Sequence, residues 1–254
     1  MSEREVVRVE RDGAVALITL DRPNARNALN AELAGAFCAA VTACQDARAI
    51  VITGADPAFC AGLDLRNLGV ERLVDLPPCA RTVAASAVPT IAAVNGAAVT
   101  GGFEVALACD FIIASERAVF ADTHLLVGVY PGPVLVDLPR RIGIAWAREM
   151  SLTGDFVDAQ TALRIGIANH VVPHAELLAA ALRRAHAIAK HEPEMVRAMR
   201  ADWTVTVGLP YEQAHRMHVE HAVEGGFRAK LGTDIAAKRD AVLDRSRAQR
   251  REPG

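Results

Sequence analysis

The chain has 254 residues, 52% of them hydrophobic and 23% charged, which is enough apolar material for one large core or two small ones. Its formal net charge of −2 gives no electrostatic basis for nucleic-acid binding. Residues 1–9 are charged and form no apolar signal segment, and the longest apolar runs are too short to span a bilayer, so we expect a cytoplasmic protein that binds no membrane.

The first predicted elements are a β-hairpin and a helix. The valine-rich residues 6–9 and the apolar run 15–20 flank a charged turn, a pattern typical of two antiparallel strands. Asn30 is placed to cap a helix, and apolar residues recur with helical spacing on one face over residues 33–44. A buried strand is predicted over residues 49–54.

Short strands and helices alternate through the middle of the chain. Further strands are predicted at residues 91–94, 111–114, 118–120 and 168–172. Helices are predicted at residues 79–86, 105–109, 134–151, 158–164 and 175–190. The longest of them contains Pro139 and Gly143, and we expect a bend at one of the two. The repeating unit is strand, strand, helix, which predicts a spiral of β-strands with helices outside.

The composition changes after Pro193. Residues 193–247 have helical periodicity and almost no strand signal, and two helices are predicted at residues 211–227 and 233–245. We therefore divide the chain into a spiral core at residues 1–192 and a C-terminal helical region at residues 193–254.

The most informative stretch is the glycine-rich segment at residues 95–104. It reads as the end of a strand, a turn and the start of a helix, where unpaired N–H groups and the helix dipole favour a phosphate or an oxyanion. Gly101 and Gly102 have no Cβ, which allows the backbone to approach a ligand closely. Glu104 lies in the first helical turn, where a carboxylate either transfers protons or simply complements the dipole. The segment lacks the P-loop Lys-Ser/Thr pair and the dinucleotide-binding glycine spacing.

Three motifs together resemble the enoyl-CoA hydratase/isomerase (crotonase) superfamily. They are R-P-x-x-x-N-A-L at residues 22–29, F-x-A-G-x-D at 59–64 and N-G-x-x-x-x-G-G at 95–102. The resemblance covers about residues 6–175. It implies an α/β fold with a crotonase-like ββα right-handed spiral core and a C-terminal helical region. In relatives that region packs across the trimer interface, so the resemblance also implies a homotrimer or a dimer of trimers.

The resemblance further implies how the site binds an acyl-CoA thioester. The backbone N–H groups of Leu63 and Gly101 would form an oxyanion hole for the thioester oxygen. Five residues match positions near coenzyme A or its phosphates: Arg26, Ala61, Gly62, Asp64 and Leu65. Two alternatives stay open, since Arg26 also fits a solvated arginine and Gly62 an ordinary turn glycine.

The proton-transfer residues depart from the pattern of the family. Hydratases of this superfamily use two glutamates, and Glu104 matches the first. The second glutamate position aligns with His124, a side chain that serves as a base near neutral pH. Asp122 is another candidate, although it lies two residues away. His124 fits a buried, hydrogen-bonded structural histidine equally well.

The expected activity is hydration of a 2-enoyl-CoA. Isomerisation of an enoyl-CoA double bond and non-catalytic acyl-CoA binding are the alternatives. Coenzyme A enters as part of the substrate, and no metal, flavin or nicotinamide is implied. Cys60 is interpreted as a packed thiol, and the five scattered cysteines fit a reducing compartment. His215, His218 and His221 recur on one helix and fit a polar face better than a metal site.

Overall fold

The computed structural model describes residues 5–66, 76–226, 239, 243 and 244. Contacts within the chain divide it into two compact units, Met1–Pro193 and Glu194–Gly254. The first unit contains both β-sheets, and the described residues of the second lie mainly in helices.

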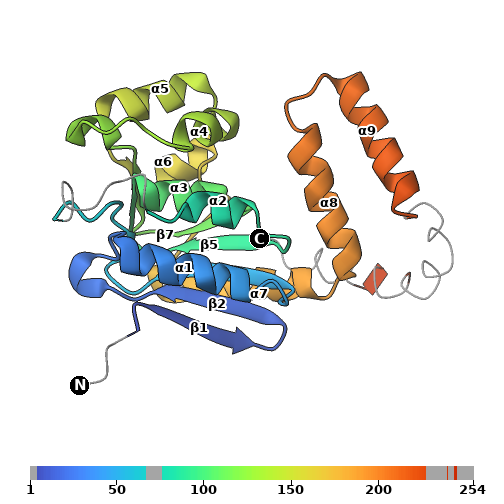
Figure 1. Ribbon diagram of the computed structural model, residues 1–254, viewed down its shortest axis with the longest axis horizontal. Coiled ribbons are helices and arrows are strands. Elements are labelled where there is room, and N and C mark those ends of the chain that lie inside the picture. Colours follow the sequence, from blue (N-terminus) through green and yellow to red (C-terminus); the bar gives the residue numbers. More distant parts are fainter. Residues whose placement is uncertain (1–4, 67–75, 227–238, 240–242, 245–254) are drawn as a thin grey trace. The chain divides into compact units, whose positions relative to one another are not determined.

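The larger sheet begins with the predicted hairpin, which is confirmed as the antiparallel pair β1 (Val7–Asp12) and β2 (Val15–Leu20). Four more strands continue the sheet in parallel. They are β3 (Ala49–Gly54), β5 (Thr90–Val94), β7 (Phe111–Ser115) and β10 (His170–Val172). The strand order is β1-β2-β3-β5-β7-β10 (Figure 1).

The smaller sheet is built from short strands inserted between those of the larger one. They are β4 (Ala58–Cys60), β6 (Ala97–Val99), β8 (Val119–Ala121) and β9 (Val157–Asp158), in the order β4-β6-β8-β9. Along the chain, one strand enters each sheet before the next helix, as in β3–β4–α2 and β5–β6–α3. The predicted strand–strand–helix repeat is therefore confirmed. The motif loops also contain β4 and β6, which the sequence pattern did not predict.

Seven helices of the first unit follow the predicted order. They are α1 (Ala31–Ala43), α2 (Cys79–Ala84), α3 (Gly101–Ala108), α4 (Val134–Ile142), α5 (Ile144–Thr153), α6 (Ala159–Ile165) and α7 (Leu177–Ala189). Asn30 caps α1 as expected, since its side chain accepts a hydrogen bond from the N–H of Leu33 at 2.9 Å. The helix expected over residues 134–151 is two helices, because Gly143 takes a positive φ of 80° between them. Pro139 stays inside α4.

The larger sheet is apolar on both faces because its strands alternate between two cores. In β2, Val15 and Leu17 face one cluster of buried side chains, whereas Ala16 and Ile18 face the other. Helix α7 covers the first face with three small residues, Ala180, Ala181 and Ala185. Small side chains let the helix axis lie close to the sheet.

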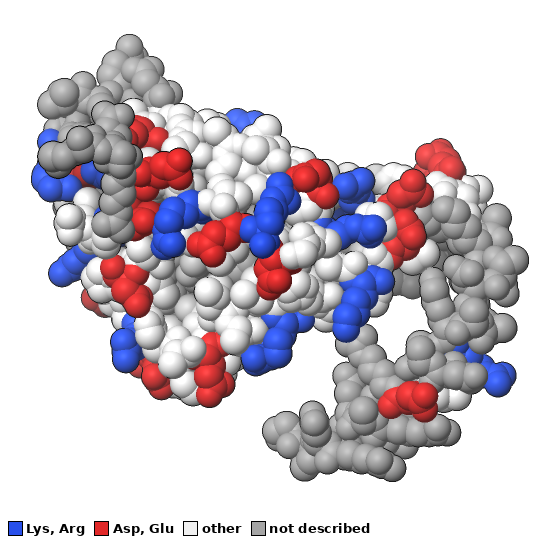
Figure 2. Space-filling model, turned by 90° about the horizontal axis from the view of Figure 1, so that it is seen from below, with Lys and Arg blue, Asp and Glu red and all other residues white. Residues whose placement is uncertain are grey.

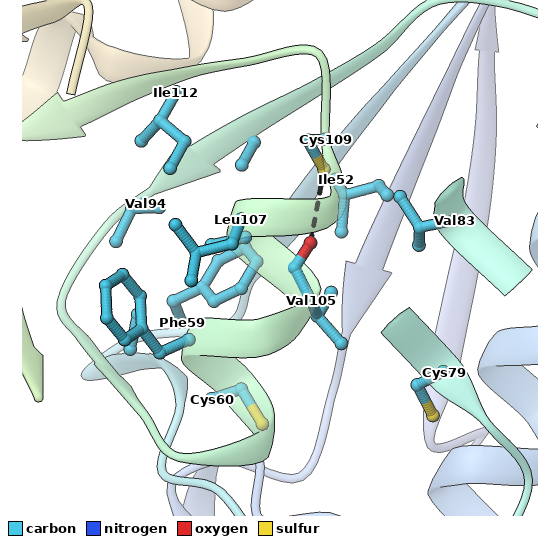
Figure 3. Close-up of a cluster of buried hydrophobic side chains, with 14 of the residues drawn as sticks. Ile52, Phe59, Cys60, Cys79, Val83, Val94, Val105, Leu107, Cys109 and Ile112 are labelled. Atoms are coloured by element: carbon cyan, nitrogen blue, oxygen red, sulfur yellow. Dashed lines mark hydrogen bonds between the residues drawn. The ribbon is translucent and has the colours of Figure 1, made fainter. Parts of the chain in front are cut away.

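Helix α3 is buried within the second and larger core. Phe103 and Phe120 pack against each other there, with ring centroids 5.6 Å apart. Around α3, apolar side chains converge from several strands and from α2 (Figure 3). The burial of α3 fixes the position of its N-terminal turn, which carries the glycine-rich motif.

The second unit contains α8 (Pro193–Thr206) and α9 (Tyr211–Glu224). The carboxylate of Asp202 on α8 bonds to Nδ1 of His218 at 2.6 Å and to Nδ1 of His221 at 2.9 Å. His215 stacks on Tyr211. Within the described ranges, no group of three or more His, Cys, Asp and Glu side chains is placed to hold a metal ion. The helix predicted at residues 233–245 lies almost entirely outside the described residues.

Acidic and basic side chains are interspersed on the face seen in Figure 2. None of the helices in the described part of the chain combines the length and the apolar character that a membrane span requires.

Candidate active site

Asn27 joins the loops that carry the first two motifs, residues 22–29 and 59–64. Its side chain is fully buried, and its Nδ2 donates to the carbonyl oxygens of Ala55 at 2.8 Å and Ala58 at 2.7 Å. Its Oδ1 accepts from the backbone N–H of Arg22 at 2.8 Å. One side chain thus satisfies three backbone groups and fixes the loop after β2 against β4.

Backbone hydrogen bonds then align the two loops residue by residue. The N–H of Ala61 donates to Arg26 at 3.0 Å. Leu29 donates to the carbonyl of Gly62 at 2.7 Å and accepts from the N–H of Asp64 at 2.9 Å, which makes a parallel bridge between Leu29 and Leu63. In such a bridge the N–H of Leu63 points away from Leu29. Among the described residues it has no hydrogen-bond acceptor.

Position 62 requires a glycine for two reasons, which are its backbone conformation and its close packing against Thr100. Its φ is 88°, and a Cβ there would overlap the side-chain oxygen of Thr100. The loop after β4 therefore contacts the residue that precedes α3. The alternative of an ordinary turn glycine does not account for this contact.

The N-terminus of α3 supplies a second unpaired N–H. Gly101 is the first residue of the helix, and its N–H has no acceptor in the described part of the chain. Thr100 before it has φ 45° and ψ −116°, a strained backbone for a residue with a branched side chain. The residue with a positive φ in this turn is therefore Thr100, and neither Gly101 nor Gly102 has one.

Gly102 has a different role from the one expected. A Cβ at this position would collide with the carbonyl oxygen of Cys60 in β4. The missing side chain therefore lets α3 pack against the smaller sheet, whereas the expectation was close approach of a ligand. Gly101 is less constrained, because its added Cβ would lie 3.2 Å from one flexible atom of Leu29.

A cavity of about 350 Å³ brings together the four residues predicted to act on the substrate, which are Leu63, Gly101, Glu104 and His124. The rest of its lining comes mainly from α1, from α2 and the residues before it, and from the loop before α4. These residues are Leu29, Ala34, Leu76, Pro77, Pro78, Cys79, Ala80, Arg81, Val129, Tyr130, Gly132 and Pro133. An apolar cavity with a few convergent polar groups is typical of a small-molecule site.

Glu104 lies half-buried in the wall of this cavity. Its Oε1 accepts a hydrogen bond from the N–H of Val134 at 3.2 Å. Burial raises the pKa of its carboxyl group above the ordinary value, and the Val134 N–H and the nearby His124 oppose that shift only in part. A carboxylate with a raised pKa is suited to accepting a proton.

His124 begins a short 3-10 helix, His124–Val127, and its side chain is only 6% exposed. Its Nδ1 lies 2.6 Å from Oδ1 of Asp122, and the other carboxylate oxygen accepts from the hydroxyl of Ser151 at 2.6 Å. Burial alone would raise the pKa of Asp122, but hydrogen bonds from His124 and Ser151 lower it overall. From the sequence, Asp122 was considered only as an alternative to His124 for proton transfer. Ser151, which lies on α5, was not predicted to belong to the site.

The residues predicted near coenzyme A lie on the two joined loops. The carboxylate of Asp64 is buried and accepts from Arg66 at 3.1 Å and from Arg22 at 3.3 Å. Hydrogen bonds from Arg66 lower the pKa of Asp64 despite its burial. Leu65 is exposed. Asp64 therefore anchors Arg22, the first residue of the R-P-x-x-x-N-A-L motif, and Arg66, which lies outside the motifs. The sequence assigned a binding role to neither arginine.

A second cavity, of about 320 Å³, lies beside these arginines. It is lined by Val6, Asp21, Arg22, Pro23, Asn24, Ala25 and Arg66. The predicted phosphate ligand Arg26 is exposed and belongs to neither cavity.

Cys60 is a packed residue, as interpreted from its sequence context. It is fully buried in β4, and burial raises the pKa of its thiol to about 12. The thiolate that nucleophilic chemistry requires is therefore not formed at neutral pH.

The chain is similar to known proteins in both sequence and structure. The sequence profile of the family described as enoyl-CoA hydratase/isomerase matches residues 10–224. A protein of Rhizobium meliloti named probable enoyl-CoA hydratase is 40% identical over 224 residues, 82% of this chain and 87% of the relative. A probable peroxisomal enoyl-CoA hydratase 1 of Arabidopsis thaliana is 35% identical over 89% of each chain. The crystal structure of an enoyl-CoA hydratase from Bacillus anthracis superimposes with a TM-score of 0.86, at 28% identity, over 93% of this chain and 96% of the other.

Proposed function

The chain belongs to the enoyl-CoA hydratase/isomerase family, and on that premise we propose that it is an enoyl-CoA hydratase. It adds water across the double bond of a 2-enoyl-CoA thioester. One observation carries the proposal: a single cavity is lined by Glu104, by His124, and by Leu63 and Gly101, whose backbone N–H groups have no acceptor among the described residues. These are the groups that hydration of a conjugated thioester needs.

The two N–H groups act on the thioester oxygen. When water attacks the β-carbon, negative charge develops on this oxygen as the enolate forms. The N–H groups of Leu63 and Gly101 donate hydrogen bonds to it, and the dipole of α3 adds to the stabilisation. Because both donors belong to backbone fixed by packing, they need little rearrangement during the reaction.

Glu104 and His124 divide the proton transfers. The carboxylate of Glu104 orients water and accepts a proton from it as the C–O bond forms. His124, in its imidazolium form, then delivers the Nε2 proton to the α-carbon of the enolate, which completes the addition of water. The proton held by Glu104 returns to Nε2 of His124 through solvent before the next turnover. The role of the second glutamate in other family members falls here to a histidine.

Coenzyme A forms the rest of the substrate and is held by the two joined loops. We propose that the backbone of Ala61, Gly62 and Leu65, together with Asp64, binds near its adenine, and that Arg26 contacts its phosphates from the exposed edge. No separate metal, flavin or nicotinamide takes part in this chemistry. Assay after exhaustive treatment with a chelator tests this point, and we expect unchanged turnover.

The test of the function is product analysis by mass spectrometry. The protein is incubated with a panel of enoyl-CoA esters of different chain length and double-bond position. Addition of one water supports hydration. A product of unchanged mass with a shifted double bond identifies an isomerase. Binding without any product, measured by calorimetry with the same esters, identifies an acyl-CoA-binding protein.

A further inference from the structure

We propose that Asp122 and Ser151 are positioning residues that hold His124 with its Nδ1 proton on Asp122 and its Nε2 toward the cavity. Nε2 is then the atom through which His124 exchanges protons with the substrate. The kinetic consequences of this inference depend on the proposed function, whereas the position of the proton does not.

The assignment of the proton follows from the chemistry of the contact. Nδ1 of His124 lies 2.6 Å from Oδ1 of Asp122, so one of the two groups must donate. The pKa of Asp122 is below the ordinary value, which makes the group a carboxylate that only accepts. The hydrogen must therefore reside on Nδ1, and the neutral imidazole carries its lone pair on Nε2.

Both oxygens of the Asp122 carboxylate are engaged, which fixes its orientation. Oδ2 accepts from the hydroxyl of Ser151 at 2.6 Å, and Oδ1 also lies 3.4 Å from the backbone N of His124. The Asp122 side chain is 1% exposed. Ser151 lies on α5, which is distant in sequence from Asp122. This helix therefore helps to fix the carboxylate of Asp122, which lies between the end of β8 and the 3-10 helix His124–Val127.

Nε2 is left free to reach the substrate. Among the described residues it has no hydrogen-bond partner. In the same part of the chain, no fully buried side-chain nitrogen or oxygen lacks a partner. Nε2 must therefore be open to solvent-filled space, and His124 lines the cavity that contains Glu104. The carboxylate on the far side of the ring stabilises the imidazolium that forms when Nε2 gains a proton.

The first experiment determines directly which ring nitrogen of His124 carries the proton. Nitrogen NMR of the full chain labelled with ¹⁵N-histidine separates protonated from bare ring nitrogens, and His124→Gln identifies the signal among eight histidines. At a pH where the ring is neutral, we expect a protonated Nδ1 and a bare Nε2. A proton on Nε2 with a bare Nδ1 overturns the inference, whatever the kinetics show.

The second experiment measures the consequence for turnover. Asp122→Asn keeps the size of the side chain and removes its charge, and we expect kcat to fall by roughly 10²-fold with little change in KM. Ser151→Ala frees one carboxylate oxygen and should cause a smaller fall in kcat. Asp12→Asn is the matched control, because Asp12 forms an exposed pair with His186 at 2.8 Å away from the cavity. It should leave both constants unchanged.

The results separate this inference from the proposed function. Unchanged kcat in a folded Asp122→Asn variant overturns the positioning role even when the wild type is an active hydratase. If the wild type converts no enoyl-CoA, the proposed function fails, and the NMR signal still decides where the proton lies. If Asp122→Asn does not fold, Ser151→Ala and the wild-type spectrum provide the test.

Discussion

At the scale of single residues, ionisation of the half-buried Glu104 has a cost for folding. The folded protein binds the Glu104 proton more tightly than the unfolded chain, because burial raises the pKa of this carboxyl above 4.5. The contribution of Glu104 to stability therefore decreases as pH rises through the window above 4.5. At neutral pH the ionised side chain opposes folding.

Glu104→Gln should therefore raise Tm at neutral pH and lower kcat by roughly 10²-fold. The amide oxygen can still accept from the N–H of Val134, so acyl-CoA affinity should be retained. Thermal melts, calorimetric titration and steady-state kinetics measure the three quantities. In the wild type, kcat should fall on the acid side with an apparent pKa above 4.5.

The control for this change is Glu149→Gln on α5, which removes the same charge from an exposed position. It should alter neither Tm nor kcat beyond small surface effects. Full turnover in Glu104→Gln would contradict the assignment of Glu104 as the group that accepts the proton from water.

Residue identities at the site could be predicted where they belong to contiguous motifs. Leu63, Gly101 and Glu104 were found this way, and His124 was found because the second glutamate position of the family aligns with it. All four line one cavity. Ser151 could not be found, because its contact with Asp122 depends on how α5 packs. The pairing of Asp122 with His124 was also missed, since a separation of two residues at the end of a strand does not fix which way each side chain points.

At the scale of elements, the two ends of α3 differ. Its N-terminus carries the strained Thr100, and the N–H of Gly101 there has no acceptor among the described residues. Near its C-terminus, the guanidinium of Arg141 donates to the carbonyl oxygens of Leu107 at 3.2 Å and Cys109 at 3.0 Å, and also to Ile167 at 3.3 Å. Arginine therefore satisfies carbonyls that the end of the helix leaves unpaired.

Gly101→Pro tests the N-terminal end. Proline removes one N–H while being compatible with the first position of a helix, so kcat should fall by roughly 10²-fold. The matched change Gly101→Ala keeps the N–H and should retain most of the activity, because its Cβ would meet only a flexible atom of Leu29. Circular dichroism checks the fold of both variants. Equal activity in the two folded proteins would exclude this N–H as an oxyanion donor.

Arg141→Met tests the C-terminal end. The change leaves three carbonyl groups without their donor, so the free energy of unfolding should decrease by about 2 kcal/mol or more. Arg140→Met is the matched control at an exposed neighbouring position and should change it by less than about 0.5 kcal/mol. Urea denaturation measures both. Equal losses in the two variants would show that Arg141 contributes only its charge.

The elements with long periodic patterns were predictable, whereas the shortest ones were not. β4 and β6 contain three residues each and lie inside loops whose glycines suggested turns. Pairing between β4 and β6, which are distant in sequence, makes them strands. The division between α4 and α5 at Gly143 also depends on tertiary packing, because Pro139 gave an equally strong signal for a bend.

At the scale of the whole molecule, exposed hydrophobic side chains on the first unit favour assembly. Several large hydrophobic side chains from the 3-10 helix His124–Val127 through the segment after α5 are exposed. They are Leu125, Leu126, Leu135, Val136, Ile144, Leu152 and Phe156. Three of them, Leu135, Ile144 and Leu152, line one cavity. Clustered exposed apolar side chains mark an interaction site more often than a free surface. We therefore retain the prediction of a homotrimer or a dimer of trimers.

Light scattering coupled to size-exclusion chromatography tests this assembly at micromolar concentration. We expect the mass of three or six chains of 27.0 kDa. Leu126→Glu and Leu152→Glu together should shift the protein toward smaller species. Glu149→Gln should leave the mass unchanged. A monomeric mass for the wild type would contradict the predicted homotrimer or dimer of trimers.

The origin of the two N–H donors has a consequence for how such a protein can evolve. Leu63 follows β4 and Gly101 follows β6, so the donors come from successive strands of one sheet, and both belong to the main chain. Almost any substitution at these positions keeps a main-chain N–H, whereas Glu104 and His124 can each be replaced by a single codon change. Under the proposed mechanism, selection can thus exchange the groups that move protons, and with them the reaction, while the two proposed oxyanion donors are inherited unchanged.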